Sequence, residues 1–399
     1  MVLPKRITKN GLAEFFIFFY LAIFPLGQLI RFKINLMGSS YPLHPVDIVA
    51  LIVFSLFILG RVKQPKVVRY FLSFLATATF STLIASFFIS RPELIRGVLY
   101  LLRLMSYVSI IPIIWSLFAN KNKKELLFKS LIAVCFAVVI FGWIQYLWLP
   151  DLRDLKYIGW DDHYYRLFGT FLDPAFTGLI IVFGSLITLS FYLKTKNYKY
   201  LYLIILFLFT LLLTYSRDSY LAFFIGLIVL LFHSRKKLVK YFLVISFLFV
   251  ISIPFLPRNI SEAAKLERTY SIFAKFDDWR DTMTIISYEP LFGVGFNNIC
   301  VARLKYLGEG DEASHACSGS DSSLLLVLAT TGVVGFSIFI NLLIKVAKNV
   351  ENNNYGNAFK ACSAALFIHS LFVNSLFYPW VMGFMGILLA ISLKERSGG

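Results

Sequence analysis

The chain has 399 residues, of which 58% are hydrophobic and 42 are phenylalanine. A soluble domain is about 45–50% apolar, so an ordinary soluble domain is excluded. The formal net charge of +17 could suggest a nucleic-acid-binding protein, but the basic residues lie in short segments between apolar stretches, so no nucleic-acid partner is expected. Stretches of roughly 20 apolar residues, enough to span a bilayer, recur along the chain. The sequence predicts an all-α, polytopic membrane protein.

Twelve transmembrane helices can be placed in chain order. The first apolar stretch is too long for a cleavable signal peptide and lacks a small-residue cleavage site, so we interpret it as a span. We find no sequence repeat or flexible linker, and treat residues 1–399 as a single integral membrane domain. The predicted spans cover residues 12–30, 46–60, 70–89, 97–119, 126–148, 175–193, 200–215, 219–232, 241–256, 322–344, 361–376 and 380–393.

The basic residues predict the orientation of these spans. With the N-terminus inside, the inner segments include KRITK, RVKQPKVVR, NKNKKELLFK, KTKNYK, SRKKLVK and the C-terminal KER. The acidic residues fall mainly in the outer segments. Because Lys and Arg concentrate in cytoplasmic loops, both termini are expected to be cytoplasmic.

Two outer loops are long. The smaller covers residues 149–174, and the larger covers residues 257–321, between spans nine and ten. Loops of this length are uncommon unless they are functional or disordered. The larger loop keeps aromatic and aliphatic residues throughout, and its segment from Asp278 to Tyr288 has a helical pattern. We therefore expect a large folded loop within the membrane domain.

Five arginines are predicted on the outer side. Arg217 lies where spans seven and eight meet, Arg166 in the smaller loop and Arg280 in the larger one. Arg96 and Arg103 are seven residues apart on span four and share a helix face. Matching acids appear too few to neutralise all five, and guanidinium groups suit phosphate oxygens, so a lipid pyrophosphate is the expected ligand. The alternatives are a plain helix anchor for Arg217 and snorkelling to the interface for Arg103.

The glycines of PLFGVGFNN, residues 290–298, give only a weak nucleotide signature. The segment has GxG without a following GK[ST], and the expected helix precedes it. Gly293 and Gly295 are more simply explained by a tight turn or a close backbone approach.

Metal and nucleophile chemistry find little support. The adjacent residues of DDH, 161–163, cannot all face one ion without an unusual loop, and no nucleophile elbow is present, so no metal is expected. His315 stands near the membrane on the outer side and is a candidate substrate contact. Cys300 and Cys317 share the large outer loop, where they form either a disulfide or two free thiols.

Three segments together resemble the O-antigen ligase and polymerase superfamily of bacterial inner membranes. They are TYSRDSYLAF, with an arginine at the outer end of a span, WRDTMTIISYEPLFGVGFNN, with the arginine, short helix and P-x-x-G-x-G stretch, and DSSLLLVLATTGVVGFSIF, which opens the span after the large loop. Twelve spans with one large periplasmic loop between the ninth and tenth also agree. The resemblance covers residues 160 to 390 well and the first 150 only as generic spans.

The resemblance implies an inner-membrane glycosyltransferase whose active site faces the periplasm. Its donor would be a glycan on undecaprenyl diphosphate, with no metal or cofactor, and its partners would be membrane lipids and possible polysaccharide assembly proteins. Arg217 and Arg280 are then expected to hold the diphosphate. The candidate substrate-binding residues are Arg166, Arg103, Arg96, His315 and Tyr215.

Asp321 separates the competing functions. Ligases of this family have a histidine at this point, whereas the present chain has an aspartate followed by Ser322 and Ser323. This departure favours a polymerase of oligosaccharide repeat units, with Asp321 as the base that receives the acceptor proton. A helix cap is the alternative role of Asp321.

Two other functions stay open. One is an O-antigen ligase that transfers glycan to lipid A–core, and the other is a transporter of lipid-linked oligosaccharide. Transporters commonly have inverted repeats and broken midplane helices, and the sequence indicates neither.

Overall fold

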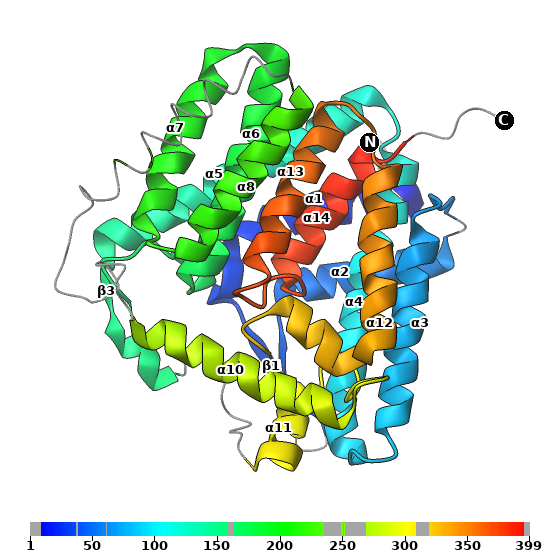
Figure 1. Ribbon diagram of the computed structural model, residues 1–399. Helices are drawn as coiled ribbons and strands as arrows, with labels where there is room; N and C mark the ends of the chain where they lie inside the picture. Colours follow the sequence, from blue (N-terminus) through cyan, green and yellow to red (C-terminus); the bar gives the residue numbers. More distant parts are fainter. Residues whose placement is uncertain are drawn as a thin grey trace, which may run out of the picture.

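Apolar helices that pack side by side make up most of the protein in its computed structural model (Figure 1). The structure describes residues 9–36, 39–60, 62–158, 163–234, 269–308 and 319–394, together with Phe249 and Ile251. The bundle consists of α1 (Lys9–Ile23), α2 (Pro45–Leu59), α3 (Val68–Ala85), α4 (Arg91–Leu117), α5 (Lys121–Trp148), α6 (Pro174–Thr195), α7 (Tyr198–Leu213), α8 (Arg217–Ser234), α12 (Ser323–Asn349), α13 (Asn354–His369) and α14 (Pro379–Ser392).

Short elements complete the described chain. Two antiparallel hairpins are formed by β1 (Phe32–Leu36) with β2 (Ser39–Leu43) and by β3 (Asp151–Leu152) with β4 (His163–Tyr164). Three 3₁₀ helices, η1 (Phe24–Leu29), η2 (Arg153–Ile158) and η3 (Gly169–Phe171), join longer elements, and α10 (Thr269–Tyr288) and α11 (Ile299–Leu307) follow the bundle's first eight helices.

Described helices overlap eleven of the twelve predicted spans, with ends that differ from the predicted ones by up to seven residues. The ninth, residues 241–256, lies outside the described residues apart from Phe249 and Ile251. Among the residues that the structure describes, six helical segments are long and apolar enough to cross a membrane: Asn10–Leu29, Val68–Ala85, Leu94–Leu117, Lys121–Trp148, Pro174–Thr195 and Ser323–Asn349. A multi-pass, all-helical protein is thus confirmed, and the full number of twelve crossings stays a prediction.

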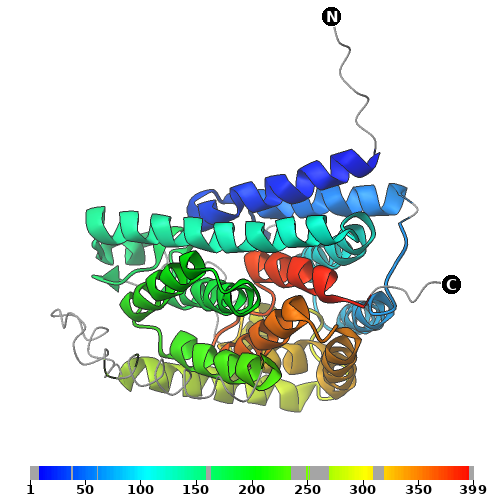
Figure 2. The same cartoon turned by 90° about the horizontal axis from the view of Figure 1, so that it is seen from above.

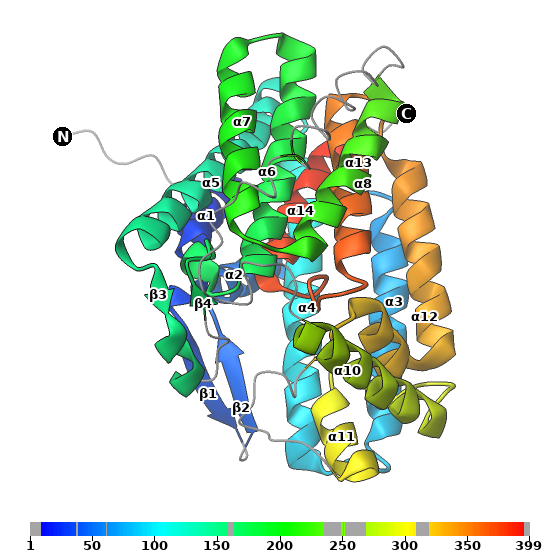
Figure 3. The ribbon, with the colours of Figure 1, turned by 60° about the vertical axis from the view of Figure 1, so that its left-hand side comes forward.

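The two ends of the bundle differ. The helices α10 and α11 and the β1–β2 hairpin gather at one end, which we call the loop end (Figures 1 and 3). The start of α1 and the end of α14 lie at the opposite end. The first and last described helices therefore have their termini on one side, as the charge pattern predicts. The assignment of that side to the cytoplasm stays a prediction.

The large loop is folded in its described part. The helix predicted from Asp278 to Tyr288 is present and begins earlier, at Thr269. A small apolar core joins α10, α11 and α12, formed by Ile285, Val294, Ile299, Ala302, Leu326 and Ala329.

The helix α12 is broken at Gly332, where φ is +64° and ψ is −174°. Residues 323–331 form an arm at the loop end, and the remainder turns to run along the bundle (Figure 1). The span predicted at 322–344 is therefore not one straight helix, but a break near the loop end does not test the expectation of no broken helix at the membrane midplane. The sequence contains a signal for the break, which is Gly332 itself, because glycine adopts positive φ without a steric penalty.

The glycine loop at residues 290–295 fills this break. The N–H groups of Val333 and Val334 donate to the carbonyls of Pro290 and Leu291 at 2.9 and 3.3 Å, which satisfies groups that the helix leaves free. The single hydroxyl proton of Ser81 in α3 is shared between the carbonyls of Phe292 and Thr330, at 2.6 and 2.7 Å from Oγ, on the two sides of this contact. Gly293 and Gly295 have φ of +71° and +86°, so the tight-turn interpretation is confirmed.

Replacing Gly332 by alanine tests the importance of this contact. An added Cβ would lie 2.2 Å from the Leu291 carbonyl oxygen, in addition to a backbone strain of about 1–3 kcal/mol for a combination of φ and ψ that essentially only glycine adopts. We expect a clear fall in the thermal unfolding temperature of the purified protein. Gly308→Ala is the matched control, since Gly308 also has positive φ but no atom within 4 Å of its Cβ position. Equal destabilisation by the two variants would contradict the predicted steric role of the break.

Candidate functional site

One face of α10 turns toward the bundle. Lys275, Asp278 and Thr282 have the spacing i, i+3 and i+7, which places them on this face. Thr282 is fully buried and its hydroxyl donates to Ser320 Oγ at 3.1 Å. The polar residues of this face therefore contact the segment that leads into α12.

Asp278 is the centre of these contacts. Its carboxylate accepts hydrogen bonds from Ser320 Oγ at 2.8 Å and from the backbone N–H of Asp321 at 2.7 Å. Its other oxygen forms an ion pair with Arg303 of α11. One side chain of α10 thus holds both α11 and the start of α12.

Asp321 itself has a carboxylate that accepts no hydrogen bond from any residue the structure describes. The side chain is half-buried. Burial, together with the negative charge of Asp278, raises the pKa of Asp321 to about 6, while Lys275 and Arg303 act in the opposite direction. A carboxylate of this kind is ionised at neutral pH and is a stronger base than an ordinary aspartate.

The cap of α12 is Ser322, whose Oγ accepts from the Leu325 N–H at 3.4 Å. The capping role considered for Asp321 is therefore wrong, because the helix begins one residue later than that interpretation requires. The carboxylate of Asp321 is left available for another partner.

Lys275 joins three elements at the loop end. Its Nζ donates to Asp218 Oδ2 at 3.0 Å and to the Phe372 carbonyl at 2.8 Å, just after α13. Asp218 is the second residue of α8, directly after the exposed Arg217. This ion pair brings the start of α8 against α10.

Arg166 and Tyr215 also lie near the start of α8. The guanidinium of Arg166 donates to the carbonyls of Thr214 and Tyr215 at 3.1–3.3 Å, at the end of α7. A cation is favourable at this position because it complements the free carbonyls of a helix C-terminus. Three predicted residues, Arg166, Tyr215 and Arg217, are therefore gathered at the α7–α8 corner.

Arg280 points away from the Asp278 contacts. Two residues further along a helix correspond to a rotation of about 200°, which places Arg280 on the opposite face of α10. Its side chain is 75% exposed and pairs with Asp277 and Asp281 of the same helix at 3.5 and 4.0 Å. Arg217 and Arg280 belong to elements joined by an ion pair, but the convergence of their side chains on one cavity stays a prediction.

Arg103 occupies a different environment from the one expected. Its Nη2 forms a buried ion pair with Asp47 at 2.8 Å, and the guanidinium lies 4.6 Å from the ring centroid of Tyr41. The sequence-based expectation that the outer arginines lack matching acids is therefore wrong for Arg103, because Asp47 at the start of α2 neutralises it. Arg96, which lies seven residues earlier on the same face of α4, is also buried.

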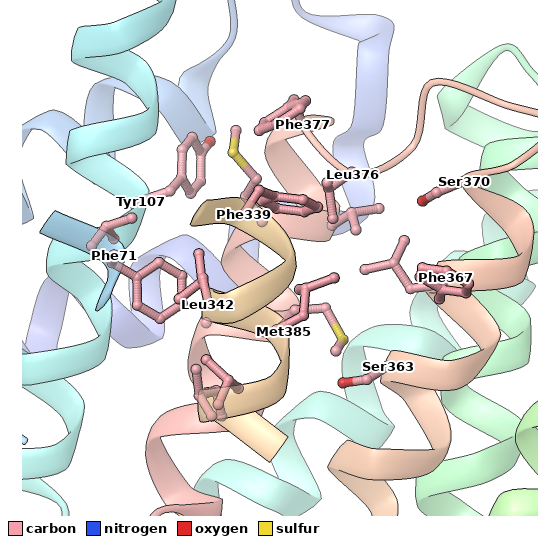
Figure 4. A pocket seen from close by; sticks show the side chains of 18 of the residues that line it. Phe71, Tyr107, Phe339, Leu342, Ser363, Phe367, Ser370, Leu376, Phe377 and Met385 are labelled. Atoms are coloured by element: carbon pink, nitrogen blue, oxygen red, sulfur yellow. The ribbon is translucent and has the colours of Figure 1, made fainter. Parts of the chain in front are cut away.

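An apolar cavity of about 380 Å³ lies between α3, α4, α12, α13 and α14. Figure 4 shows side chains from several of these helices pointing into it, among them Phe71, Tyr107, Phe339, Phe367 and Met385. One end is formed by Leu324 and Ser370. Because the Ser370 carbonyl accepts from the Ser323 N–H at 2.8 Å, this end lies beside the residues that follow Asp321.

Sequence reasoning missed Lys275, Asp278, Arg303 and Asp47. The signal for Asp278 and Thr282 was their shared face on a predicted helix, and Lys275 extends that face by one turn beyond the predicted start. The pairs with Arg303 and Asp47 join residues 25 and 56 positions apart in the sequence, and no local pattern indicates them.

The proposed disulfide can be tested directly. Cys300 is disulfide-bonded, Cys135 and Cys362 are free and buried, and His315 and Cys317 lie outside the described residues. We predict that a reductant releases two additional thiols that react with maleimide in the denatured protein, and that Cys317→Ser leaves Cys300 reactive without reduction. Closing a loop of this size contributes about 3 kcal/mol in the chain-entropy model. Labelling unaffected by the reductant would contradict the pairing.

Comparison with known proteins gives two matches. The model of the O-antigen ligase family matches residues 201–340. A protein of Rickettsia prowazekii (strain Madrid E) named "Putative polysaccharide ligase" is 25% identical over 205 residues. That match covers 45% of this chain and 48% of the relative, so the chain spans about half the length of the curated relative it matches.

The family match contains all three segments on which the resemblance was based. It includes Arg217, Arg280 and Asp321, and the described parts of α7, α8, α10 and α11. The resemblance is therefore confirmed: the model of the O-antigen ligase family matches residues 201–340 of this chain.

Proposed function

We propose that this protein is a glycosyltransferase that polymerises oligosaccharide repeat units carried on undecaprenyl diphosphate, at the periplasmic face of a bacterial inner membrane. The observation that carries the proposal is the Asp321 carboxylate, which is half-buried, free of hydrogen bonds to the described residues and close to Lys275 and Arg303. It lies within the segment that matches the O-antigen ligase family.

The reaction is a displacement at the anomeric carbon of the donor sugar. The acceptor hydroxyl oxygen forms a bond to that carbon while its proton passes to Asp321. The bond from the same carbon to the diphosphate oxygen breaks, and the diphosphate leaves with the electron pair. Cationic side chains stabilise the negative charge of the leaving group, which is the main electrostatic contribution to such a reaction.

Arg217 and Arg280 are the proposed ligands of the diphosphate. Both are exposed at the loop end, and the pair between Asp218 and Lys275 holds their helices together. A guanidinium group binds two phosphate oxygens at once and keeps its charge at any physiological pH. Arg166 and Tyr215 lie beside Arg217 and are assigned to substrate binding in the same proposal.

The apolar cavity supports a donor with a long hydrocarbon chain. Its lining is almost entirely apolar, and its end at Leu324 and Ser370 lies next to the segment that begins with Asp321. A hydrocarbon chain that enters this cavity would have its polar head at the loop end, near the proposed base.

An O-antigen ligase is the second candidate. The matching family model and the Rickettsia protein are both named as ligases, whereas Asp321 in place of a histidine favours the polymerase. Deleting the gene in its host separates the two candidates on a lipopolysaccharide gel. Loss of a polymerase leaves core with a single repeat unit, and loss of a ligase leaves bare core.

A transporter is the less supported alternative. The break in α12 is a feature that transporters use to line a substrate path. Here, however, the loop at residues 290–293 occupies the break and satisfies its backbone groups. A gel profile unchanged by the deletion would contradict both glycosyltransferase assignments.

Asp321→Asn tests the proposed base. Asparagine keeps the size of the side chain but cannot take a proton, so we expect loss of polymer in a strain complemented with the variant at matched expression. Ser322→Ala is the control, since it removes the helix cap at a cost of about 1 kcal/mol but leaves the carboxylate. Full-length polymer from Asp321→Asn would remove Asp321 from the mechanism.

The pH dependence of transfer provides a second test. A base with a pKa of about 6 predicts that the rate falls as the pH drops through 6, where Asp321 becomes protonated. Asp278→Asn removes a negative charge that raises this pKa, so its acid limb should move to lower pH. Lys275→Met removes a positive charge, so its limb should move to higher pH. The measurement is the initial rate against pH with purified protein.

These two shifts distinguish an electrostatic role from a structural defect. A variant that is only misfolded in part loses rate at every pH without moving the midpoint. Shifts of the same sign in Asp278→Asn and Lys275→Met would contradict the assignment of Asp321 as the titrating group.

A further inference from the structure

The outward face of α10 carries a strip of apolar side chains with one arginine. Phe273, Phe276 and Met283 are 66%, 57% and 51% exposed, and Arg280 lies between them. Their spacing of three, four and three residues places all four on one stripe of the helix. We call this stripe the α10 strip. Three large apolar side chains grouped this way on one helix are unusual for a surface in water.

The α10 strip points sideways from the bundle. Seen along the bundle, α10 lies at the edge of the molecule, with α8 further inside and α12 beside one end of α10 (Figure 2). The inner face of α10 is fixed to these helices by Lys275 and Asp278. The opposite face must therefore be directed away from the bundle, toward whatever surrounds it.

The depth of α10 is set by the same contacts. Lys275 bonds to Asp218 at the start of α8 and to the Phe372 carbonyl just beyond α13, while Asp278 bonds to the backbone of Asp321 just before α12. All three points are the ends of apolar helices. In a protein that crosses a bilayer, helix ends lie at the boundary between hydrocarbon and water.

We propose that the α10 strip lies in the headgroup region of the bilayer leaflet at the loop end, as an interfacial helix. The phenylalanines and Met283 enter the boundary of the acyl chains, and Arg280 lies at the level of the lipid phosphates. Helices that rest in this region have aromatic and aliphatic residues on one side and basic residues beside them.

Two features favour lipid over a protein partner. Further large apolar residues are exposed at the break of α12, namely Leu291 of the loop that fills it and Val333 of α12 itself, and α12 is long and apolar enough to span the membrane. The charge also complements lipid, because Arg280 is the basic member of the strip while Asp277 borders it on the side away from Phe276 and Met283. Exposed apolar residues of both α10 and α12 would thus face the bilayer.

The proposal can be tested by spin labelling in liposomes of phosphatidylethanolamine and phosphatidylglycerol. Single cysteines are introduced as Phe276→Cys and Met283→Cys in a full-length background with Cys135 and Cys362 replaced by alanine. Ala274→Cys is the matched control, since Ala274 is exposed on the same helix but lies on its other edge. Each label is then compared for its accessibility to oxygen, which concentrates in lipid, and to a water-soluble nickel chelate.

We expect the ratio of oxygen to nickel accessibility to be several-fold higher at positions 276 and 283 than at position 274. Arg280→Glu reverses the charge beside the phosphates and should lower the ratio at position 283. Equal ratios at all three positions would place the strip in water and overturn the proposal. Shielding of positions 276 and 283 from both probes would overturn it in favour of a protein that covers the strip.

The measurement does not depend on catalysis. Labels in lipid together with an active Asp321→Asn variant would support the interfacial helix and contradict the proposed function. The reverse result would contradict only the interfacial helix.

Discussion

The carboxylate of Asp278 is the interaction on which the loop end depends. It accepts from Ser320 and from the backbone of Asp321, and it pairs with Arg303. A carboxylate that is largely removed from water is stable only when such partners replace its hydration. Each hydrogen bond to a charged group contributes about 1.5–3 kcal/mol net, and together the contacts fix α10, α11 and the start of α12 relative to one another. The position of Asp321 follows directly, because its own backbone is one of the three partners.

The break at Gly332 is the second constraint, and it acts with the first. A straight α12 would carry Ser323 further along the bundle axis, away from Ser370 and α10. Because of the break, residues 323–331 run in a different direction from the rest of α12 and form a short arm at the loop end. The free backbone groups at the break need partners, and the loop after α10 supplies them through Pro290 and Leu291. The segment made of α10 and its following loop is thus held against α12 at two places. Asp278 holds it at the start of α12, and the break at Gly332 holds it through the loop.

The sequence predicted well what depends on composition and local pattern. Apolar length located the helices of the bundle, and the pattern after Asp278 located most of α10. Long-range pairing was not accessible in the same way. Arg103 was expected to bind a ligand, yet it is neutralised by Asp47, which is distant in sequence and unremarkable within an apolar helix. The helix cap was misplaced by one residue because Asp321, Ser322 and Ser323 all have side chains that could cap, and only the backbone geometry selects Ser322.

The proposed base and one proposed diphosphate ligand lie on opposite sides of α10, whereas the sequence analysis expected them at one site. Asp321 is held on the inner side, where burial and a neighbouring negative charge make it a better base. Arg280 is held on the outer side, where water or lipid phosphate can reach it. In the proposed reaction the base must meet the acceptor hydroxyl while cations meet the diphosphate, and these groups lie on opposite sides of the anomeric carbon during an in-line displacement. A helix that holds Asp321 against one face and carries Arg280 on the other is therefore consistent with the reaction when the donor extends around the end or edge of α10. On this view, Lys275 and Arg303 act on the charge of Asp321, and Arg217 and Arg280 act on the leaving group.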